Sequence, residues 1–288
     1  MGITRLVTIT AAVGFVMAAL TRAWSWSLLL AGTVALLGTA LSAAGANAVN
    51  QWMERARDGR MERTKGRPLP SGRVTPGAVL WSGVALCALG VGLLFVAGPA
   101  PAVISLACVV SYVAMYTPLK TRSSLNTFVG AIPGALPPLI GTSAALGGGF
   151  ESLSHPIGLS LFAIMFVWQL PHFLAIAWLY REDYEAGGYV MLPHVDPDGR
   201  VTAGAMTLWS WALVPASLLP AVFMPEVVGV VYPIVAIVTG LVYAVFCVRL
   251  ALTRRRADAR VVFFASIAHL PLLLIVMVGE GVARSVLT

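Results

Sequence analysis

Long apolar segments recur along almost the whole of this sequence, and they constrain its fold more than any other feature. A helix needs about 20 predominantly apolar residues to cross the roughly 30 Å hydrocarbon core of a membrane. We therefore expect an all-α, polytopic membrane protein, a bundle of nine transmembrane helices that forms a single domain over residues 1–288. The expected spans are 3–20, 26–50, 77–97, 99–117, 126–146, 157–180, 205–224, 227–249 and 261–282.

The basic residues are distributed very unevenly between the two ends of this bundle. Of the 19 Lys and Arg residues, only Arg22 and Arg284 fall on the face opposite to the N-terminus. Because cytoplasmic loops carry the excess of positive charge, we expect a multi-pass protein of the inner (plasma) membrane with a cytoplasmic N-terminus. The net charge of +7 then reflects topology. A nucleic-acid partner is not expected, because no soluble basic domain is present.

A stripe of polar residues follows the second span. Asn50, Glu54 and Asp58 are each four residues apart and share one face of a helix. A charge at membrane depth costs about 2.5–3.5 kcal/mol, which marks such acids as functional. Their hard oxygen ligands suit Mg²⁺, which takes one or two carboxylates and the phosphates of a substrate. The stripe therefore predicts a metal-bound diphosphate at the membrane edge, at the end where the basic residues gather.

Basic residues next to this stripe suit a phosphate, since their charge and forked donors match its oxygens. The alternative is a solvated loop that contacts anionic lipid. The residues that follow the stripe are Arg60, Arg63, Lys65 and Arg67, and Lys120 with Arg122 form a further patch after Tyr116-Thr-Pro118. A Lys-x-Arg at a helix end can also be a topology determinant alone.

A second acidic cluster follows span six, in the sequence Tyr180-Arg-Glu-Asp183-Tyr184. We expect Asp183 to be a metal ligand, because it recurs with Tyr180 and Gly187 at helical spacing. Taken alone, the cluster is also typical of a solvated helix end. The two acidic loops are similar in length and lie on the same side, which suggests a pair of sites that face each other.

Two apolar spans contain unusual residues. Span five holds Gly130, Pro133, Gly134, Pro137, Pro138 and Gly141. This pattern predicts either a kinked helix that lines a cavity or close packing through small residues. His172 lies beside a proline in span six, and an intramembrane histidine must hydrogen-bond, titrate or ligate. The alternative is a satisfied interior histidine, and His269 in span nine is in the same position.

These motifs together resemble a known family. The run from Asn47 to Leu69, with Asn-Gln-Trp-Met-Glu-Arg-Ala-Arg-Asp at its centre, is similar to the first Asp-rich motif of the UbiA superfamily of intramembrane prenyltransferases. The heme-using branch of this family is suggested by four further motifs, in the same order and on the same loops. They are Tyr116–Arg122, Gly134–Pro138, Trp168–Phe173, and Arg181–Tyr184 with Met191–Pro193. The resemblance covers roughly residues 45–280.

The resemblance implies a nine-helix bundle around a central cavity that opens to lipid. In the heme-using branch, a farnesyl group passes from farnesyl diphosphate to a vinyl group of heme B, with Mg²⁺ as cofactor. The expected partners are these two substrates, membrane lipid, and a downstream heme A synthase or terminal oxidase. Transferred position by position, the metal ligands are Asn50, Glu54, Asp58 and Asp183. These four are also catalytic, with Lys120 and Arg122, and the substrate-binding residues are Asn47, Arg63, Arg67, Tyr116, His172 and Tyr180.

One departure from the family pattern lies inside the stripe, because Ala56 stands where an acidic residue is usual. Metal binding then depends on fewer carboxylates. Two other interpretations stay open. Another UbiA-type prenyltransferase would act on a quinone precursor or a chlorin and lack the Trp-Gln-x-Pro-His motif. A membrane transporter would place its acids near mid-bilayer instead of clustering them at one edge.

Overall fold

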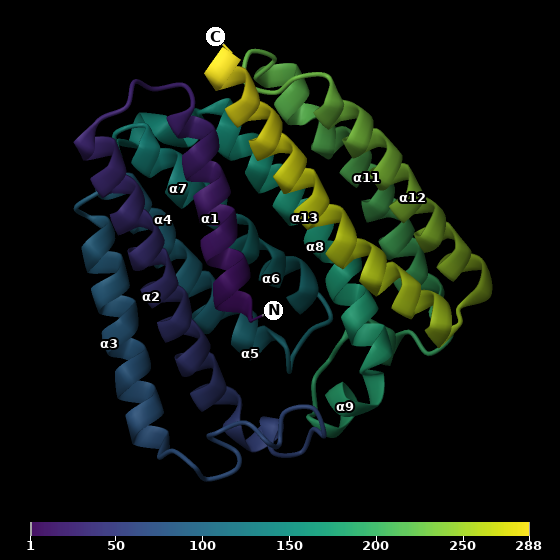
Figure 1. Ribbon diagram of the computed structural model, residues 1–288. Helices are drawn as coiled ribbons and strands as arrows, with labels where there is room; N and C mark the ends of the chain where they lie inside the picture. Colours follow the sequence, from purple (N-terminus) through teal and green to yellow (C-terminus); the bar gives the residue numbers. More distant parts are fainter. Residues whose placement is uncertain (1, 288) are drawn as a thin grey trace.

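The computed structural model describes residues 2–287, and all the regular secondary structure in this range is helical (Figure 1). The helices of the first half are α1 (Ile3–Ala19), α2 (Trp26–Asp58), α3 (Pro76–Leu94), α4 (Pro99–Val110), a π-helical turn (Ser111–Tyr116), α5 (Thr117–Leu119), α6 (Asn126–Ala135) and α7 (Pro137–Ala145). A 3₁₀ turn (Phe150–Ser154) follows. Then come α8 (Pro156–Leu179), α9 (Arg181–Ala186), α10 (Leu192–Val195), α11 (Arg200–Phe223), α12 (Val231–Thr253) and α13 (Arg256–Leu287).

Among the described residues, eight helical segments are long and apolar enough to cross a membrane. They begin with α2, and α4–α5 and α6–α7 each count as one segment. The apolar helix α1 has 17 residues and completes the nine expected spans. The boundaries differ from prediction, since α2 continues to Asp58 and α13 runs from Arg256 to Leu287. A helix satisfies its backbone internally and need not end where its apolar run ends.

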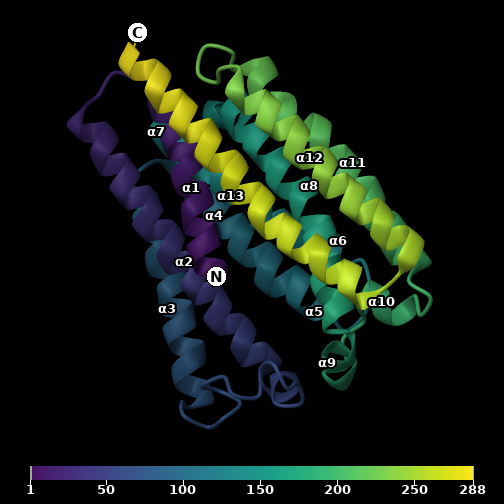
Figure 2. The ribbon, with the colours of Figure 1, turned by 45° about the vertical axis from the view of Figure 1, so that its right-hand side comes forward.

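The helices form a bundle whose two flanks are long hairpins. Figures 1 and 2 both show α2 beside α3 at one flank and α11 beside α12 at the other, with α1, α6, α8 and α13 between them. The larger apolar core lies among α8, α11, α12 and α13, and a smaller one lies among α2, α3, α4 and α7. The loop after α2 and helix α9 lie at the same end of the bundle, which we call the α9 end (Figure 1).

The proline-rich span five is broken into two helices and is also the most buried span. Helix α6 ends at Ala135, and α7 starts at Pro137, whose ring cannot continue the preceding helix. In an 18-residue stretch of this span, 72% of the residues are buried. Gly141 lets the backbone of α1 approach at Ala11, and Gly130 leaves room for the ring of Tyr116. Kinking and close packing therefore occur together.

Three acidic residues away from the predicted site have structural roles. Asp196 accepts hydrogen bonds from the backbone N–H and the hydroxyl of Thr202 at the start of α11. Glu280 accepts from two backbone N–H groups in the first turn of α12, where an anion is favourable. Asp258 is buried and forms a 2.8 Å ion pair with Arg249. These acids stabilise helix ends and are excluded as candidates for the site.

Candidate active site

The stripe on α2 faces the π-helical turn and α5, and its three predicted residues are all buried. Asn50 donates a 2.9 Å hydrogen bond from its amide nitrogen to Thr117 Oγ1. One turn earlier, Asn47 donates to Thr4, and the hydroxyl of Tyr112 lies 3.3 Å from its oxygen. Tyr112 lies in the π-helical turn and Thr117 follows it at the start of α5, whereas Thr4 belongs to α1. Such π turns are frequent at functional sites.

Glu54 forms a buried ion pair with Lys120. Glu54 Oε1 lies 2.8 Å from Lys120 Nζ, and the two side chains are 8% and 12% exposed. Burial lowers the pKa of Lys120, but the Glu54 carboxylate outweighs it, and the pKa is raised above its usual value. The ammonium group also lies 4.5 Å from the ring centre of Tyr116. Lys120 is therefore held charged beside the stripe, as predicted from its position in the sequence.

Asp58 is paired with Arg67 on the loop that follows α2. Asp58 Oδ2 lies 2.8 Å from Arg67 Nη1, and the aspartate side chain is 1% exposed while the arginine is 37% exposed. The loop folds back over the helix end, because the Thr64 hydroxyl donates to the carbonyl of Asp58. Each buried carboxylate of the stripe thus has one basic partner, and the partners come from different loops.

The second acidic loop contacts the first at the α9 end. Asp183 Oδ1 accepts a 3.0 Å hydrogen bond from the backbone N–H of Glu62. Arg63 lies 5.1 Å from the ring centre of Tyr180 and donates a 3.3 Å hydrogen bond to the hydroxyl of Tyr184. Two loops more than 100 residues apart in the chain therefore meet, and the predicted residues Arg63, Asp183 and Tyr180 meet with them.

Tyr189 is a site residue that the sequence reasoning missed. Its side chain is buried, and its ring centre lies 5.8 Å from both Arg57 and Lys120. Burial raises the pKa of its hydroxyl, and the carboxylates of Glu54 and Asp58 raise it further. The segment is fixed because Val190 N–H donates to the carbonyl of Lys120. The tyrosine follows Gly187-Gly188, and this turn was the signal available in the sequence.

A hollow of about 170 Å³ opens between these elements. It is lined by Met53, Glu54, Arg57, Thr117, Pro118, Thr121 and Tyr189. Arg122 is not brought into the cluster, since its side chain is exposed and makes no hydrogen bond or ion pair within residues 2–287. The exposed Arg60 likewise makes no such contact in that range.

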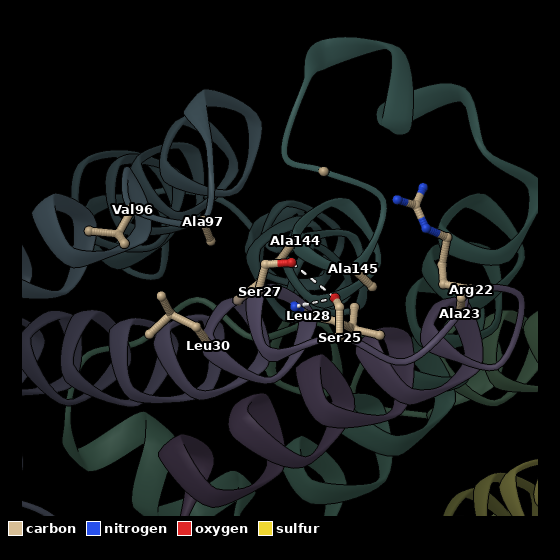
Figure 3. Close-up of a pocket in the computed structure, with 12 residues that line it drawn as sticks. Arg22, Ala23, Ser25, Ser27, Leu28, Leu30, Val96, Ala97, Ala144 and Ala145 are labelled. Atoms are coloured by element: carbon tan, nitrogen blue, oxygen red, sulfur yellow. Dashed lines mark hydrogen bonds between the residues drawn. The ribbon is translucent and has the colours of Figure 1, made fainter.

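A second, larger hollow lies at the opposite end of the bundle (Figure 3). Its volume is about 230 Å³, and it lies beside the connection between α1 and α2. Arg22, Ser25 and Ser27 line it together with small apolar residues of α7. The hydroxyl of Ser25 already caps α2 by accepting from Leu28 N–H. None of the predicted site residues lines this hollow.

The donor set at the α9 end fits Mg²⁺ only in combination with a substrate. Within residues 2–287, no three acidic, histidine or cysteine side chains lie close enough together to hold a metal ion. Mg²⁺ commonly uses one or two carboxylates and completes its octahedral shell with water and substrate phosphates. The buried Glu54 and Asp58, one turn apart on one face, match that requirement. The absence of an acid at Ala56 is consistent with such a small protein ligand set.

His172 lies deeper in α8 and is attached to α13. Its Nδ1 lies 2.7 Å from the hydroxyl of Ser266. The rings of Trp168 and Phe263 stack on the imidazole, with centre distances of 4.7 Å and 5.4 Å. The residue is partly buried, whereas His269 is fully buried. The two histidines, which the sequence placed in similar surroundings, therefore differ in their burial.

Within residues 2–287, nine apolar helical segments with buried carboxylates and cations clustered at one edge define a membrane-embedded protein with a charged site at that edge. Comparison with known proteins gives its class, since residues 6–268 match the model of the UbiA prenyltransferase family. The chain belongs to the UbiA prenyltransferase family.

Curated relatives share much of the sequence. A protein named protoheme IX farnesyltransferase from Solibacter usitatus is 46% identical over 245 residues, which cover 83% of this chain and 80% of the relative. One with the same name from Salinibacter ruber is 38% identical over 273 residues, which cover 93% and 92%. The match therefore extends over nearly the whole length of both proteins.

Solved structures show the same fold at low sequence identity. A structure of digeranylgeranylglyceryl phosphate synthase has a TM-score of 0.78 at 16% identity and covers 96% of this chain and 93% of its own. A UbiA homolog from Archaeoglobus fulgidus, solved with DMAPP and Mg²⁺, has a TM-score of 0.64 at 14% identity and covers both chains fully. The predicted fold, a bundle of nine apolar helical segments, is confirmed for residues 2–287.

Proposed function

We propose that this protein transfers the farnesyl group of farnesyl diphosphate to a vinyl group of heme B, which gives heme O. The observation that carries the proposal is the cluster of Glu54, Asp58, Lys120 and Arg67 at the α9 end. It supplies two carboxylates for a metal and two cations for a diphosphate. The names of the relatives at 46% and 38% identity support heme as the acceptor. The clustering of the acids at one edge disfavours a transporter.

The chain's own residues would stabilise the departing diphosphate. Glu54 and Asp58, with Asn50 on the same face of α2, would hold Mg²⁺ together with the phosphates of the substrate, and the ion would neutralise phosphate charge. Lys120 and Arg67 are already positioned by their carboxylate partners, and Arg63 projects from the same loop. Donors that are fixed before the reaction need no reorganisation when charge develops on the leaving group. The exposed Arg122 would join them from its loop once the headgroup binds.

The reaction breaks the C1–O bond of farnesyl diphosphate, and the oxygen keeps the electron pair. The vinyl group of heme B donates its electron pair to the allylic carbon and forms the new C–C bond. Water then adds to the resulting cation and loses a proton, which gives a hydroxyethylfarnesyl side chain. The apolar helices around the hollow exclude bulk water from the allylic cation until the bond has formed. The protein lowers the reaction barrier further by holding the two substrates in the orientation in which they react.

The arrangement of charge suggests where the reaction takes place. The α9 end carries most of the basic loops, and by the positive-inside rule it would face the cytoplasm at the inner (plasma) membrane. Farnesyl diphosphate would enter with its headgroup in water and its chain in lipid. The product is a membrane-soluble heme, and a heme A synthase or a terminal oxidase would take it up. In this proposal, residues 1–288 act as one domain.

The test uses the purified full-length protein in lipid nanodiscs. Incubation with heme B, farnesyl diphosphate and Mg²⁺ should produce heme O, detected by mass spectrometry. Chelation by EDTA should stop the reaction, and excess Mg²⁺ should restore it. Replacing heme B with a quinone precursor or a chlorin separates the rival activities. Product from those acceptors and none from heme B would overturn the proposal.

A matched pair of variants tests the site itself. Asp58→Ala removes the most deeply buried carboxylate of the stripe and should abolish product formation. Asp198→Ala removes a carboxylate that is 63% exposed and that forms an ion pair with the exposed Arg200. This control should keep wild-type activity. Equal activity of both variants would remove Asp58 from the metal site.

A further inference from the structure

Within residues 2–287, the hydrogen bond between His172 and α13 is made by one residue, Ser266. The Ser266 hydroxyl lies 2.7 Å from His172 Nδ1, and the Ser266 carbonyl accepts a 2.9 Å hydrogen bond from Trp168 Nε1. Ser266 itself is fully buried. Trp168 and His172 are one turn apart on α8 and stack on each other. The imidazole is therefore held between the rings of Trp168 and Phe263, and Ser266 supplies its hydrogen bond.

The hydrogen bonds of Ser266 determine which nitrogen of His172 carries the proton. A serine hydroxyl has one proton to donate. The Ser266 hydroxyl donates it to the carbonyl of Phe263, at 2.6 Å. Toward His172 it can then act only as an acceptor, so Nδ1 must be the donor. A neutral imidazole with its proton on Nδ1 has a free lone pair on Nε2.

The other nitrogen is available to a ligand. Within residues 2–287, His172 Nε2 has no hydrogen-bond partner, and it is not enclosed in the core. In His269 both nitrogens are enclosed and unpartnered. A histidine with one nitrogen held and the other exposed is the arrangement that metal-ligating histidines show, where the second hydrogen bond fixes the ring and its tautomer.

His172 lies deeper in the bundle than the residues of the α9 end. Tyr180, at the end of the same helix, lies against Arg63. His172 is eight residues earlier, which places it about 12 Å deeper along α8 at 1.5 Å per residue. Of the groups in the protein and in its two proposed substrates, the iron of heme B is the Lewis acid that would reach this depth. This step rests on the proposed function.

We propose that Ser266 is a positioning residue that holds His172 in its Nδ1–H tautomer, so that Nε2 coordinates the iron of bound heme B. Coordination would fix the porphyrin and its vinyl group relative to the diphosphate at the α9 end. Loss of such a supporting hydrogen bond typically weakens a metal–ligand interaction by about 10–100-fold. Ser266 touches neither substrate in this arrangement.

The test is a titration of the full-length protein in nanodiscs with ferric heme B, without farnesyl diphosphate. Absorption and electron paramagnetic resonance spectra report the axial ligand, and the titration gives the affinity. The variants are His172→Ala, Ser266→Ala and Ser266→Thr. Ser210→Ala is the matched control, because Ser210 is equally buried and donates to a carbonyl three residues earlier without contacting a histidine.

We expect the wild type to show a histidine-ligated spectrum and His172→Ala to lose it. Ser266→Ala should bind heme about 10–100-fold more weakly with a changed spectrum. Ser266→Thr restores the hydroxyl and should recover the wild-type spectrum, and Ser210→Ala should match the wild type. Wild-type spectra and affinity in Ser266→Ala, together with heme O formation, would overturn this inference and leave the proposed function intact. Failure of the wild type to form heme O would overturn both.

Discussion

The carboxylate of Asp183 accepts a 3.0 Å hydrogen bond from the backbone N–H of Glu62, which joins the loops after α8 and α2. Asp183→Ala should release this contact and loosen both loops. We expect faster tryptic cleavage after the exposed Arg60 and Arg63, measured by mass spectrometry of the fragments. Asp198→Ala, on an adjoining loop, is the control. Unchanged cleavage in Asp183→Ala would show that the contact does not hold the loops together.

Breaking the buried ion pair should be more damaging than removing it entirely. Lys120→Met leaves the Glu54 carboxylate buried without a partner, which should cost about 3–5 kcal/mol of folding free energy. Adding Glu54→Gln removes the stranded charge and should recover most of the stability, but not the activity. Thermal unfolding in detergent and heme O formation measure the two effects. Additive losses in the double variant would contradict the pairing.

The raised pKa of Lys120 predicts how this pair responds to alkali. A group whose pKa is higher in the folded state than in the unfolded state contributes its full stabilisation at any pH below the unfolded-state pKa. This stabilisation is lost as the pH rises through the folded-state pKa. The pair should therefore keep its contribution up to the ordinary lysine pKa of 10.5 and lose it only above that value. Unfolding temperatures of the wild type and Glu54→Gln/Lys120→Met, compared from pH 8 upward, should differ by a constant amount until then. A difference that already disappears near pH 8 would contradict the raised pKa.

Tyr189 should take part in diphosphate binding. A tyrosine hydroxyl is protonated at neutral pH, and burial raises the pKa of this one further, so it is a hydrogen-bond donor beside the hollow. Tyr189→Phe should lower kcat/KM by about tenfold, which corresponds to ~1.4 kcal/mol. Tyr232→Phe is the control, because that hydroxyl donates to the carbonyl of Ser217 and lines neither hollow. Equal kinetics in Tyr189→Phe and the wild type would limit Tyr189 to packing.

The close approach of α1 and α7 at Gly141 can be tested by adding one methyl group. A Cβ at this position would overlap the backbone carbonyl of Ala11. Gly141→Ala should therefore destabilise the protein by about 1–3 kcal/mol, measured by thermal unfolding. Gly204→Ala adds the same methyl on exposed α11, where nothing lies within 4 Å. It should be neutral or slightly stabilising, because alanine favours a helix.

The number of helices and the face that carries the site could be predicted because both depend on local patterns. Apolar length predicts a span, and four-residue spacing places Asn50, Glu54 and Asp58 on one side of α2 regardless of the rest of the fold. The prediction that the acidic loops face each other is confirmed by the contact between Asp183 and Glu62.

The partners of these residues could not be predicted, because they depend on long-range packing. Nothing in the local sequence shows that Lys120 pairs with Glu54 and Arg67 with Asp58. The exposure of Arg122, the inclusion of Tyr189 and the contact between His172 and Ser266 likewise depend on how distant helices meet. The roles of the predicted metal ligands stay predictions until a cation is measured at the site.

Helix α2 extends without interruption from the apolar interior to Asp58. A prenyl diphosphate is a detergent-like molecule, with one half that partitions into oil and another that stays hydrated. Helix α2 crosses the same boundary between hydrocarbon and water. It therefore offers the apolar half and the hydrated half of the prenyl diphosphate their preferred surroundings at a fixed separation. The enzyme therefore has no need to pull its substrate out of the membrane or to drag a charged group into it, and the reactive carbon arrives at the interface by simple partitioning.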